Sequence, residues 1–485
     1  MAGDDHLAGR EASPDGGGGL RPRAGANSTG RLASASVSTA VLWLRRDLRL
    51  ADSPALLAAR DGADEVLPLF VLDDALRRPS GAPRLAFLYR CLRELEDRTD
   101  GRLRVLTGRP EQVVPRVARE VAATAVHISS DHGPYGRARD ERVRAALGEV
   151  PLVATGSPYG VTPGTLLKAD GTPYRVYSPY ARAWRARGLH SPALTPRVVH
   201  WTDGGLATDG VPPDPDLGDV QLPAAGERAA LARWQGFVAE GASGYAQTRN
   251  RPALAGTSVM SAHLKYGCIH PRTMHAALGT DEGALTYAGE LVWRDFYADV
   301  LWHAPRSARE DLQPQLGSLE YDEGPDADRR FTAWATGTTG YPIVDAGMRQ
   351  LLGEAWVHNR VRMIVASFLT KDLHLHWSRG ARHFMRHLRD GDLASNSHGW
   401  QWVAGTGTDA SPYFRVFNPV KQGRDHDPDG DYIRCWVPEL RGVPGKAVHE
   451  PWLLPGGPPT GYPPPVVDHA EERAEALRRY SAARR

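Results

Sequence analysis

The sequence predicts a protein of two parts, an α/β part built on a parallel sheet and then an all-helical part. Between residues 39 and 160, apolar β-rich runs alternate with helix-like segments across short links, as in βαβ units. Over 227–480, apolar residues recur at spacings of three and four, which is typical of helices. Residues 161–226 are rich in Pro, Gly and Thr, so we expect a long surface connector between the two parts.

The expected strands and helices of the first part follow one another in a regular order. Strands are expected at 41–44, 66–72, 103–106, 125–129 and 150–153, and helices near 54–60, 83–98, 110–121 and 134–147. Layering and handedness rules then give a doubly wound domain. No Gly-x-Gly-x-x-Gly follows the first strand, where RRDLRL stands, so the usual dinucleotide site is not expected.

The second part shows helical periodicity in five segments. They are 228–239, 283–302, 342–353, 356–374 and 379–389. In the fourth, Asn359, Arg362 and Met363 share one face. A buried guanidinium needs an anion, and the candidates for Arg362 are Asp390 and Asp392 in RDGDL.

Composition sets outer limits on function. The chain has 485 residues, 41% hydrophobic and 24% charged, with a formal net charge of +2. Any affinity for nucleic acid must therefore come from a local patch. We expect no disulfide framework or zinc ribbon, because there are only three widely spaced cysteines, Cys91, Cys268 and Cys435; this fits a reducing cytosol. No apolar run reaches the length of a membrane span.

The N-terminal segment is not expected to fold, and the clustered histidines are not expected to bind a metal. Residues 1–38 are rich in Gly, Ala, Ser and Arg without periodicity, so we expect a disordered tail. Histidines cluster in the helical part at His374, His376, His383 and His387. Without an HExxH motif or an obvious third carboxylate ligand, no metal site is expected.

Tryptophans gather in the stretch from Trp356 to Trp402, which holds four of the 13 in the chain. They stand among Arg, Asp and Asn rather than in a plain apolar stripe. Tryptophan stacks well on planar ligands and holds cations, and it can be oxidised by one electron. The cluster therefore predicts a planar redox cofactor and a planar substrate.

Polar groups near these tryptophans suggest what would orient such ligands. In GELVWRDFY, a helix would place Glu290, Trp293 and Arg294 on one side, so that an indole can stack while a carboxyl bonds a polar edge. Asn396 carries an amide that both donates and accepts, as a flavin ring nitrogen requires. Residues 244–267 mix hydroxyls with basic side chains ahead of a helix, a pattern that favours phosphate binding.

Taken together, these motifs closely resemble the photolyase/cryptochrome family, in its class I branch that repairs cyclobutane pyrimidine dimers. The resemblance covers nearly all of 40–480. It is carried in order by RRDLRL, WRDFY, TGYPIVDAGMRQL, HNRVRM, DGDLASN, GWQWVAGTGTDA and YFRVFNP. It implies a lyase in which light-excited reduced FAD injects one electron into a dimer flipped out of DNA; photolyases are among the base-flipping enzymes.

The resemblance also implies roles for individual residues. Contacts to FAD fall on Tyr245, Thr257, Ser258, Ser261, Glu290, Arg294, Asn359, Arg362, Asp390, Asp392 and Asn396. Contacts to the flipped lesion fall on Glu290, Trp293, Asn359, Met363 and Trp402, and contacts to backbone phosphates fall on Arg249 and Arg360. The catalytic groups implied are Glu290, Asn396, Trp400 and Trp377.

Trp400 and Trp377 match the inner two members of the family's tryptophan electron relay. The outermost member lies about ten residues before the position of Trp334, and here Gly324 stands in its place. Tyr321 lies near and is a candidate substitute, and another surface tryptophan is the alternative. The route of photoreduction is therefore open, whereas repair by already reduced flavin is not affected.

A second chromophore is implied for the first part. Arg46, Asp131 and Lys265 resemble the pattern of forms that bind an 8-hydroxy-5-deazaflavin antenna. The alternatives are methenyltetrahydrofolate and an empty site. We further expect a cytoplasmic monomer that acts on damaged DNA and is associated with the nucleoid if the source is prokaryotic.

Three other functions are compatible with parts of this pattern. A cryptochrome shares the fold and FAD but signals; only about 30 residues follow HEPW, and the lesion set is complete, which favours repair. A (6-4) photolyase would carry His where Met363 stands. A flavin-dependent dark oxidoreductase would need a nicotinamide fingerprint, which the sequence lacks.

Overall fold

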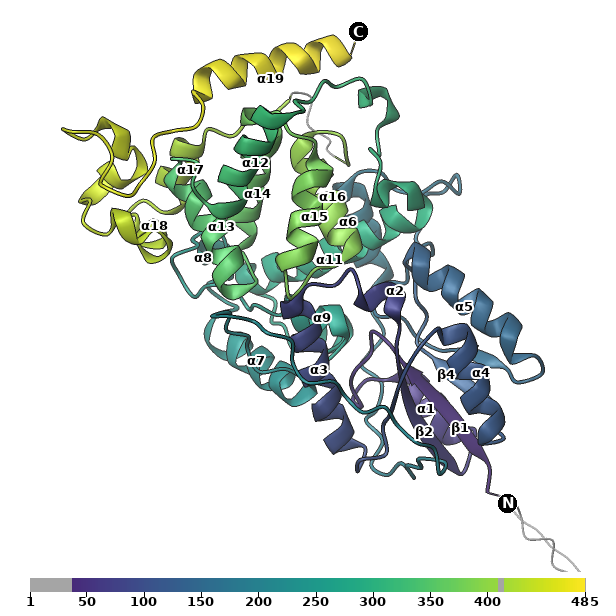
Figure 1. Ribbon diagram of the computed structural model, residues 1–485. Helices are drawn as coiled ribbons and strands as arrows, with labels where there is room; N and C mark the ends of the chain where they lie inside the picture. The colour runs from purple at the N-terminus through teal and green to yellow at the C-terminus, as the bar shows by residue number, and fades with distance from the viewer. Residues whose placement is uncertain (1–36, 409–413, 485) are drawn as a thin grey trace, which may run out of the picture. The chain divides into compact units, whose positions relative to one another are not determined.

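The computed structural model describes residues 37–408 and 414–484, so the expected disordered tail falls almost wholly outside the described residues. The first part contains a five-stranded parallel sheet in the order β3-β2-β1-β4-β5 (Figure 1). Its strands are β1 (Thr39–Leu44), β2 (Glu65–Leu72), β3 (Arg104–Thr107), β4 (Ala125–Ile128) and β5 (Leu152–Ala154). All five overlap the strands expected from the sequence.

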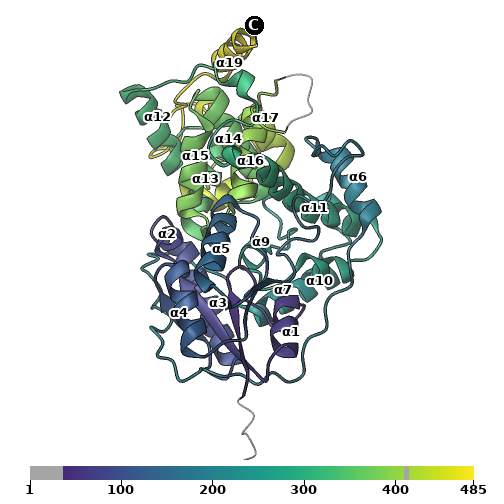
Figure 2. The ribbon, with the colours of Figure 1, turned by 90° about the vertical axis from the view of Figure 1, so that its right-hand side faces the viewer.

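Helices cover both faces of this sheet. They are α1 (Pro54–Asp61), α2 (Asp74–Arg77), α3 (Ala82–Arg98), α4 (Pro110–Glu120) and α5 (Pro134–Leu147). Along β1, Leu42 and Leu44 pack in one hydrophobic cluster with α1 and α3, while Val41 and Trp43 pack in another with α4 and α5. Successive strand side chains point to opposite faces, so β1 is buried on both. The doubly wound architecture is confirmed (Figure 2).

The expected connector is not without secondary structure. It contains α6 (Tyr177–Arg187), which the sparse periodicity of 161–226 did not reveal. This helix packs against the helical part: Trp184 is buried, and its Nε1 donates to Oδ2 of Asp295 at 2.9 Å. The rest of the connector runs back past the sheet, where Trp201 bridges to Val66 in parallel fashion.

The second part is all-helical, as predicted. Its α-helices are α7 (Glu227–Glu240), α8 (Tyr245–Thr248), α9 (Ser261–Tyr266), α10 (Pro271–Ala276), α11 (Glu282–His303), α12 (Pro325–Thr336), α13 (Pro342–Glu354), α14 (Asn359–Ser367), α15 (Trp377–His387), α16 (Leu393–Ala404), α17 (Pro419–His426), α18 (Asp431–Trp436) and α19 (His469–Ala483). No described helix is both long and apolar enough to cross a membrane.

The prediction of one helix over 356–374 was wrong. The α14 helix begins only at Asn359, because the His358 side chain accepts the backbone N–H of Arg360 and caps the first turn. It ends at Ser367 and continues as a π-helical turn, η3 (Phe368–Asp372). Periodicity alone does not distinguish the wider π turn from an α turn.

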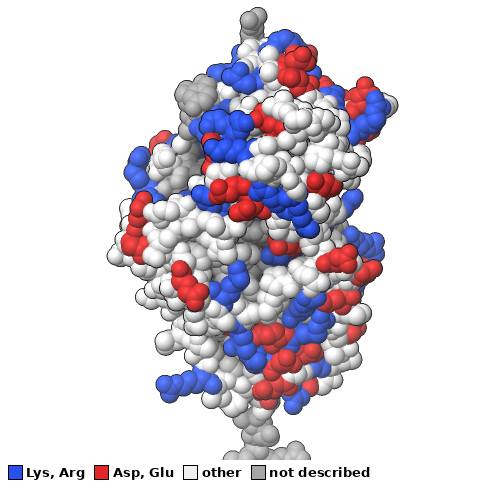
Figure 3. Space-filling model, turned by 90° about the vertical axis from the view of Figure 1, so that its left-hand side faces the viewer, with Lys and Arg blue, Asp and Glu red and all other residues white. Residues whose placement is uncertain are grey.

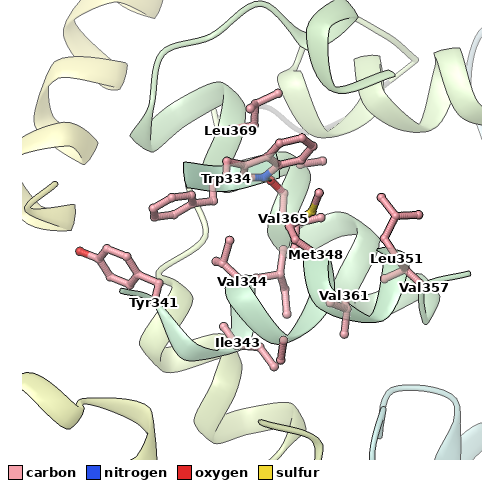
Figure 4. Close-up of a cluster of buried hydrophobic side chains, with 14 of the residues drawn as sticks. Trp334, Tyr341, Ile343, Val344, Met348, Leu351, Val357, Val361, Val365 and Leu369 are labelled. Atoms are coloured by element: carbon pink, nitrogen blue, oxygen red, sulfur yellow. Dashed lines mark hydrogen bonds between the residues drawn. The ribbon is translucent and has the colours of Figure 1, made fainter. Parts of the chain in front are cut away.

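The core of the helical part lies where α13, α14, α15 and α16 meet. Trp334 on α12 is fully buried there, and its indole N–H donates to the Val365 carbonyl at 2.9 Å. Figure 4 shows Trp334 beside Val365 and Leu369, with the side chains of α13 next to them. These contacts pack α12 and α13 against α14, which carries predicted site residues.

The cysteines are free thiols, as their number and spacing predict. The structure also shows a contact that the positions of the cysteines in the sequence did not indicate. The sulfur atoms of Cys91 and Cys268 are both buried and lie 3.5 Å apart.

A candidate active site in the helical part

Glu290 lies on α11 and forms an ion pair with Arg249, the residue that follows α8. Nη2 of Arg249 is 2.6 Å from Oε1 of Glu290, and the two side chains are 31% and 28% exposed. Burial raises the pKa of Glu290 above its ordinary value, and the Arg249 guanidinium opposes this shift. The sequence suggested separate ligands for these two residues, whereas the structure joins them.

Trp293, one turn after Glu290, is held by an aromatic partner that the sequence did not reveal. The rings of Trp293 and Tyr177 are stacked with centroids 3.6 Å apart and planes parallel. The Tyr177 hydroxyl donates to the Gly289 carbonyl at 3.0 Å, which fixes the tyrosine ring against α11. One face of the Trp293 indole is therefore covered by α6, so a further planar group can stack only on the opposite face.

Arg362 on α14 resolves the choice left open by the sequence, because it pairs with Asp390. Nη2 of Arg362 is 2.8 Å from Oδ2 of Asp390, whose side chain is 2% exposed. Nε of Arg362 also donates to the Val357 carbonyl at 2.7 Å. Burial alone would favour the neutral acid, but the Arg362 guanidinium holds the pKa of Asp390 below its usual range.

The other predicted residues of α14 point out of the core. Asn359 is exposed at the first position of the helix, and Met363 is half-buried against the edge of the core. The Arg360 guanidinium donates to Oδ1 of Asn250 at 2.9 Å. Burial lowers the pKa of Arg360, and the nearby Arg249 lowers it further. Two of the predicted phosphate-binding cations are thus close enough to repel each other.

The α16 helix, which packs against both α11 and α14, carries the remaining predicted residues. Asp392 caps its N-terminus by accepting the backbone N–H of Ser395 at 3.1 Å. One turn in, the Asn396 amide donates to the Ala381 carbonyl at 3.0 Å; its oxygen stays available as an acceptor. Further along, Trp400 is buried while Trp402 is only half-buried.

Trp400 is surrounded by aromatic rings. Its centroid lies 5.1 Å from that of Phe384 and 6.0 Å from that of Trp334, both in edge-on geometry. Gly380 makes room for it, because a Cβ there would lie 2.1 Å from the indole. Trp377 is the first residue of α15, the helix that carries Gly380. Its Nε1 donates to Oδ1 of Asp311 at 2.7 Å.

The segment predicted to bind phosphate is only partly arranged for that role. Tyr245 is buried among aromatic rings, and Thr257 is half-buried. The Ser258 hydroxyl is already hydrogen-bonded to that of Tyr287 at 2.7 Å. The Ser261 hydroxyl is buried, and its side chain helps to lower the pKa of the Asp390 carboxyl.

The three predicted antenna residues form one charge cluster with Asp392. Oδ2 of Asp392 lies 2.7 Å from Nη2 of Arg46 and 4.0 Å from Nζ of Lys265. Asp131 pairs with Arg139 at 3.2 Å and also acts on Arg46. The sequence indicated that Asp392 faces the FAD, but in the structure its carboxylate pairs with Arg46, 346 positions earlier in the chain.

Charge and burial shift the proton affinities in this cluster strongly. Burial, reinforced by Arg46, lowers the pKa of Lys265 to about 7. Burial opposes the ionisation of Asp131, but Arg139 and Arg46 together lower the pKa of that residue to about 2. Arg46, Lys265 and Asp392 line a small cavity of about 50 Å³, together with His132 and Tyr159.

Gly267 brings the two parts of this cluster together. It ends α9 in the left-handed conformation, with φ +67°. A Cβ at this position would lie 1.9 Å from the Arg46 carbonyl oxygen. Only glycine permits both the conformation and the close approach, and that approach is what places Lys265 beside Arg46.

A second cavity, of about 230 Å³, opens at Trp402 and was not predicted from the sequence. Its wall includes Lys371 from η3 and Tyr480 and Arg484 from α19. All charged groups in the described lining are basic. Arg415, also in the lining, lies over the Trp402 ring at 5.6 Å. The residues that line this cavity lie far apart in the sequence, so the sequence alone could not indicate that they share one site.

On the face drawn in Figure 3, basic side chains do not form one continuous surface. Figure 3 shows a face on which a mostly uncharged middle is bordered by Lys and Arg together with acidic residues. This agrees with the near-neutral net charge of the chain.

The clustered histidines bind side chains of the protein itself. His374 pairs with Glu472 at 2.7 Å, and His376 contacts the Ser378 hydroxyl at 2.8 Å. The rings of His383 and His387 lie 4.4 Å apart. Within residues 37–408 and 414–484, no group of three or more His, Cys, Asp or Glu side chains is arranged to hold a metal ion.

Comparison with known proteins defines the class of protein first. The model of the DNA photolyase family matches residues 40–197, and the model of the FAD-binding domain of DNA photolyase matches residues 287–482. The matched regions are the doubly wound part with the first half of the connector, and the helical part from within α11 onward. The class defined in this way is a protein with a DNA photolyase region and an FAD-binding domain.

The chain belongs to the DNA photolyase family. A deoxyribodipyrimidine photo-lyase from Streptomyces griseus is 42% identical over 90% of this chain and 98% of its own length. The enzyme of that name from Escherichia coli is 36% identical over 93% of this chain and 100% of its own length.

Solved structures agree with this assignment. A bacterial class III photolyase from Agrobacterium tumefaciens superposes with a TM-score of 0.87 at 34% identity, over 94% of this chain and 99% of its own. A cryptochrome from Synechocystis superposes with a TM-score of 0.84 at 26% identity, over 91% of this chain and 99% of its own. The fold is therefore shared by proteins of both kinds, and the choice between them depends on the site.

Proposed function

We propose that this protein repairs cyclobutane pyrimidine dimers in DNA by light-driven electron transfer from reduced FAD. The observation that carries the proposal is the exposure of the five implied lesion contacts. Glu290, Trp293, Met363 and Trp402 are half-buried, and Asn359 is exposed. Two indoles and a thioether would normally be used to fill a core; here they stay accessible on three helices that pack together, α11, α14 and α16.

The residues present fit FAD in the helical part. Oδ1 of Asp390 is buried without a hydrogen-bond partner among the described residues, and the Ser261 hydroxyl, which helps to lower the pKa of this carboxyl, is buried beside it. Buried polar atoms are rarely left unsatisfied, so a polar ligand at this place would supply what is missing. We propose that FAD is held by Tyr245, Thr257, Ser258, Ser261, Glu290, Arg294, Asn359, Arg362, Asp390, Asp392 and Asn396. When bound and reduced, FAD supplies a light-excitable one-electron donor.

Asn396 and the Arg362–Asp390 pair give the site its fixed electrostatics. The amide of Asn396 is anchored through its NH₂ group, so its free oxygen can accept a hydrogen bond from a ring N–H of a planar cofactor. Asp390 stays ionised because of Arg362, and it holds that guanidinium at the start of α14. Preorganised dipoles and charges of this kind need no rearrangement during the reaction.

The lesion would be clamped between indoles whose positions are set before it arrives. Tyr177 covers one face of Trp293, so the lesion would stack on the opposite face. Trp402 supplies the second platform, and Met363 can adapt to the irregular space between them. Burial raises the pKa of Glu290 and Arg249 opposes that shift, so a Glu290 released from Arg249 would be protonated more readily and could then donate to a pyrimidine carbonyl.

Arg249 and Arg360 would meet the phosphates that flank the lesion. In the structure Arg249 pairs with Glu290, so phosphate binding and release of the Glu290 carboxyl are linked. An arriving phosphate that takes Arg249 removes the charge that keeps Glu290 ionised. Glu290 then takes up a proton more readily, at the moment when the lesion carbonyl needs a donor.

For the antenna we propose an 8-hydroxy-5-deazaflavin near Arg46, Asp131 and Lys265, with methenyltetrahydrofolate as the alternative. Arg46 and Lys265 lie on the wall of one small cavity, where Asp392 pairs with Arg46; a protonated Lys265 there would favour an anionic chromophore. An archaeal photolyase from Sulfolobus tokodaii, 29% identical to this chain, has been solved with two FAD molecules, so a second flavin is a further alternative. We also propose that the protein acts as a cytoplasmic monomer.

The test is to illuminate reduced, FAD-loaded protein with oligothymidylate that contains dimers, and to follow the absorbance of restored thymines. Recovery in the light and none in the dark is expected. Glu290→Gln and Trp293→Ala should lower the yield, while Glu310→Gln on the exposed surface serves as the control. A protein that binds and reduces FAD but restores no thymine would be a cryptochrome-type receptor instead.

A further inference from the structure

The connector helix α6 lies against α11, the helix that carries Glu290 and Trp293 (Figure 2). Tyr177, Tyr180 and Trp184 stand three and four residues apart, so they share one face of α6. Tyr180 and Trp184 are 0% and 2% exposed. This face therefore packs on α11, and it fixes where Tyr177, the first residue of α6, lies.

Two contacts fix the position of α6 along α11. The indole N–H of Trp184 donates to Oδ2 of Asp295, a buried residue of α11, at 2.9 Å. The ring of Tyr180 lies 5.2 Å from that of Phe296. Rotation or sliding of α6 would break a hydrogen bond to a buried carboxylate, which is costly. Tyr177, one turn before Tyr180, therefore meets α11 at a fixed point.

Tyr177 holds Trp293 both at its ring and at its backbone. The two rings are stacked with centroids 3.6 Å apart and planes parallel. The Tyr177 hydroxyl donates to the Gly289 carbonyl at 3.0 Å. In an α-helix each carbonyl also accepts the backbone N–H four residues further on, and for Gly289 that residue is Trp293. The phenol thus sets the plane of the indole and contacts the helical turn that carries it.

The Tyr177 hydroxyl remains a hydrogen-bond donor at neutral pH. Burial raises the pKa of Tyr177 to about 12; Arg185 and Arg249 oppose the shift, and Glu290 adds to it. The charges of Arg249 and Glu290 therefore reach the phenol, which places it next to the ion pair of the candidate site. The hydroxyl keeps its proton and can hold the Gly289 carbonyl throughout the working range of pH.

The other described ring contacts of Trp293 come from its own helix. The ring of Phe296 lies at 5.8 Å with planes at 72°, and the ring of Tyr297 at 5.4 Å with planes at 44°. Both residues move with α11, whereas Tyr177 ties the indole to a second helix. A side chain that is already ordered loses less conformational entropy when a ligand stacks on it. Tyr177 therefore prepares Trp293 for a planar ligand.

We propose that Tyr177 is a positioning residue for recognition of the pyrimidine dimer, because it holds the Trp293 indole in the orientation in which the dimer stacks. This inference rests on the proposed function. Undamaged DNA, held through its phosphates, does not depend on the orientation of this indole. Loss of the Tyr177 ring therefore lowers the preference for dimer-containing DNA rather than the affinity for DNA in general.

The test is competition binding in the dark between oligothymidylate with and without a dimer, on FAD-loaded protein. We expect Tyr177→Ala to lower the preference for the dimer by about twofold to tenfold, the range that corresponds to the usual strength of one aromatic pair. Tyr177→Phe keeps the ring and should retain most of the preference. The affinity for the undamaged strand and the FAD content should stay the same in both variants.

A double-mutant cycle shows whether Tyr177 acts through the indole. In Trp293→Ala protein, the additional change Tyr177→Ala should not alter the preference further, because no ring is left to position. Tyr174→Ala is the matched control. Tyr174 is another half-buried tyrosine of the connector, with its ring 6.0 Å from that of Tyr180 and no described ring contact with Trp293. Its replacement should leave the preference unchanged.

An unchanged preference in Tyr177→Ala overturns the inference. So does an equally large loss in Tyr177→Phe or in Tyr174→Ala, or a further loss when Trp293 is already absent. Tyr177→Leu, which fills the space with an aliphatic side chain, takes the place of Tyr177→Ala if that variant does not retain FAD.

Repair of dimers by illuminated, reduced, unaltered protein is measured in parallel. Repair together with an unchanged preference in Tyr177→Ala contradicts the role of Tyr177 alone. A preference for dimers that depends on Tyr177 but leads to no repair contradicts only the proposed repair activity. Unaltered protein that neither prefers dimers nor repairs them contradicts both.

Discussion

The ion pair between Arg362 and Asp390 gives the most quantitative prediction, and a double-mutant cycle measures it. Asp390→Asn removes charge without changing the shape of the side chain, and Arg362→Gln replaces the guanidinium by a shorter, neutral amide; the double variant combines both changes. The Asp390 side chain is 2% exposed and that of Arg362 is 27% exposed, with 2.8 Å between Nη2 and Oδ2. Exposed pairs couple by about 0–1 kcal/mol, and hydrogen bonds to buried charges contribute about 1.5–3 kcal/mol. For this half-screened pair we expect a coupling of about 1–2 kcal/mol.

The assay is urea unfolding at two fixed FAD concentrations, with coupling taken from the four free energies of unfolding. A tenfold rise in FAD should add about 1.4 kcal/mol to every variant that is saturated, which separates binding from folding. The pair Arg306–Glu310 has the same 2.8 Å separation but is 83% and 57% exposed, so it serves as the control and should couple by about 0.3–0.5 kcal/mol. Equal coupling for both pairs would refute the argument from burial.

The coupling should also depend on pH in one direction. Arg362 lowers the pKa of Asp390 in the folded protein, so the unfolded chain binds the proton more readily. Stability from this pair is then fully present above the unfolded value of about 4 and is lost as pH falls through the lower folded value. A coupling that grew on acidification would contradict this sign.

Four further predictions concern single residues. Trp402→Ala should weaken the preference for dimer-containing over intact DNA by about 1–3 kcal/mol, the scale of one base–aromatic stack; unchanged discrimination in competition binding would remove Trp402 from the lesion site. Trp400→Phe should slow photoreduction of oxidised FAD far more than repair by chemically reduced protein, and equal loss of both would indicate a structural role. Gly267→Ala should lower the free energy of unfolding by more than the roughly 1 kcal/mol expected for left-handed strain alone, whereas Gly101→Ala, with φ +70° and nothing within 4 Å, should cost only that strain. Since Lys265 has its pKa lowered to about 7, an anionic antenna chromophore should bind more weakly as pH rises above 7, and Lys265→Met should abolish that dependence.

Local sequence pattern was enough to predict the sheet, because buried parallel strands appear as continuous apolar runs. It also predicted that Arg362 needs an anion, but not which one. In the structure Asp392 forms its ion pair with Arg46, which lies far away in the sequence, and Arg362 forms its ion pair with Asp390. No local pattern carries that information.

The same limit explains the features that were missed. Tyr177 stands in a stretch with little periodicity, yet its ring covers one face of Trp293. The break in the expected helix at 356–374 arises from a side-chain cap and a π turn, neither of which changes the apolar spacing. Contacts between distant segments and the hydrogen bonds of helix ends had to come from the structure.

The central claim is that a flavin held by the helical part, beside two accessible indoles, splits pyrimidine dimers when illuminated. The most direct measurement is the number of thymines restored per unit of light by protein loaded with reduced FAD, compared with the same protein stripped of FAD. We predict restoration that rises in proportion to FAD occupancy and stops in the dark. Restoration independent of FAD or of light, or none from fully loaded protein, would contradict the account.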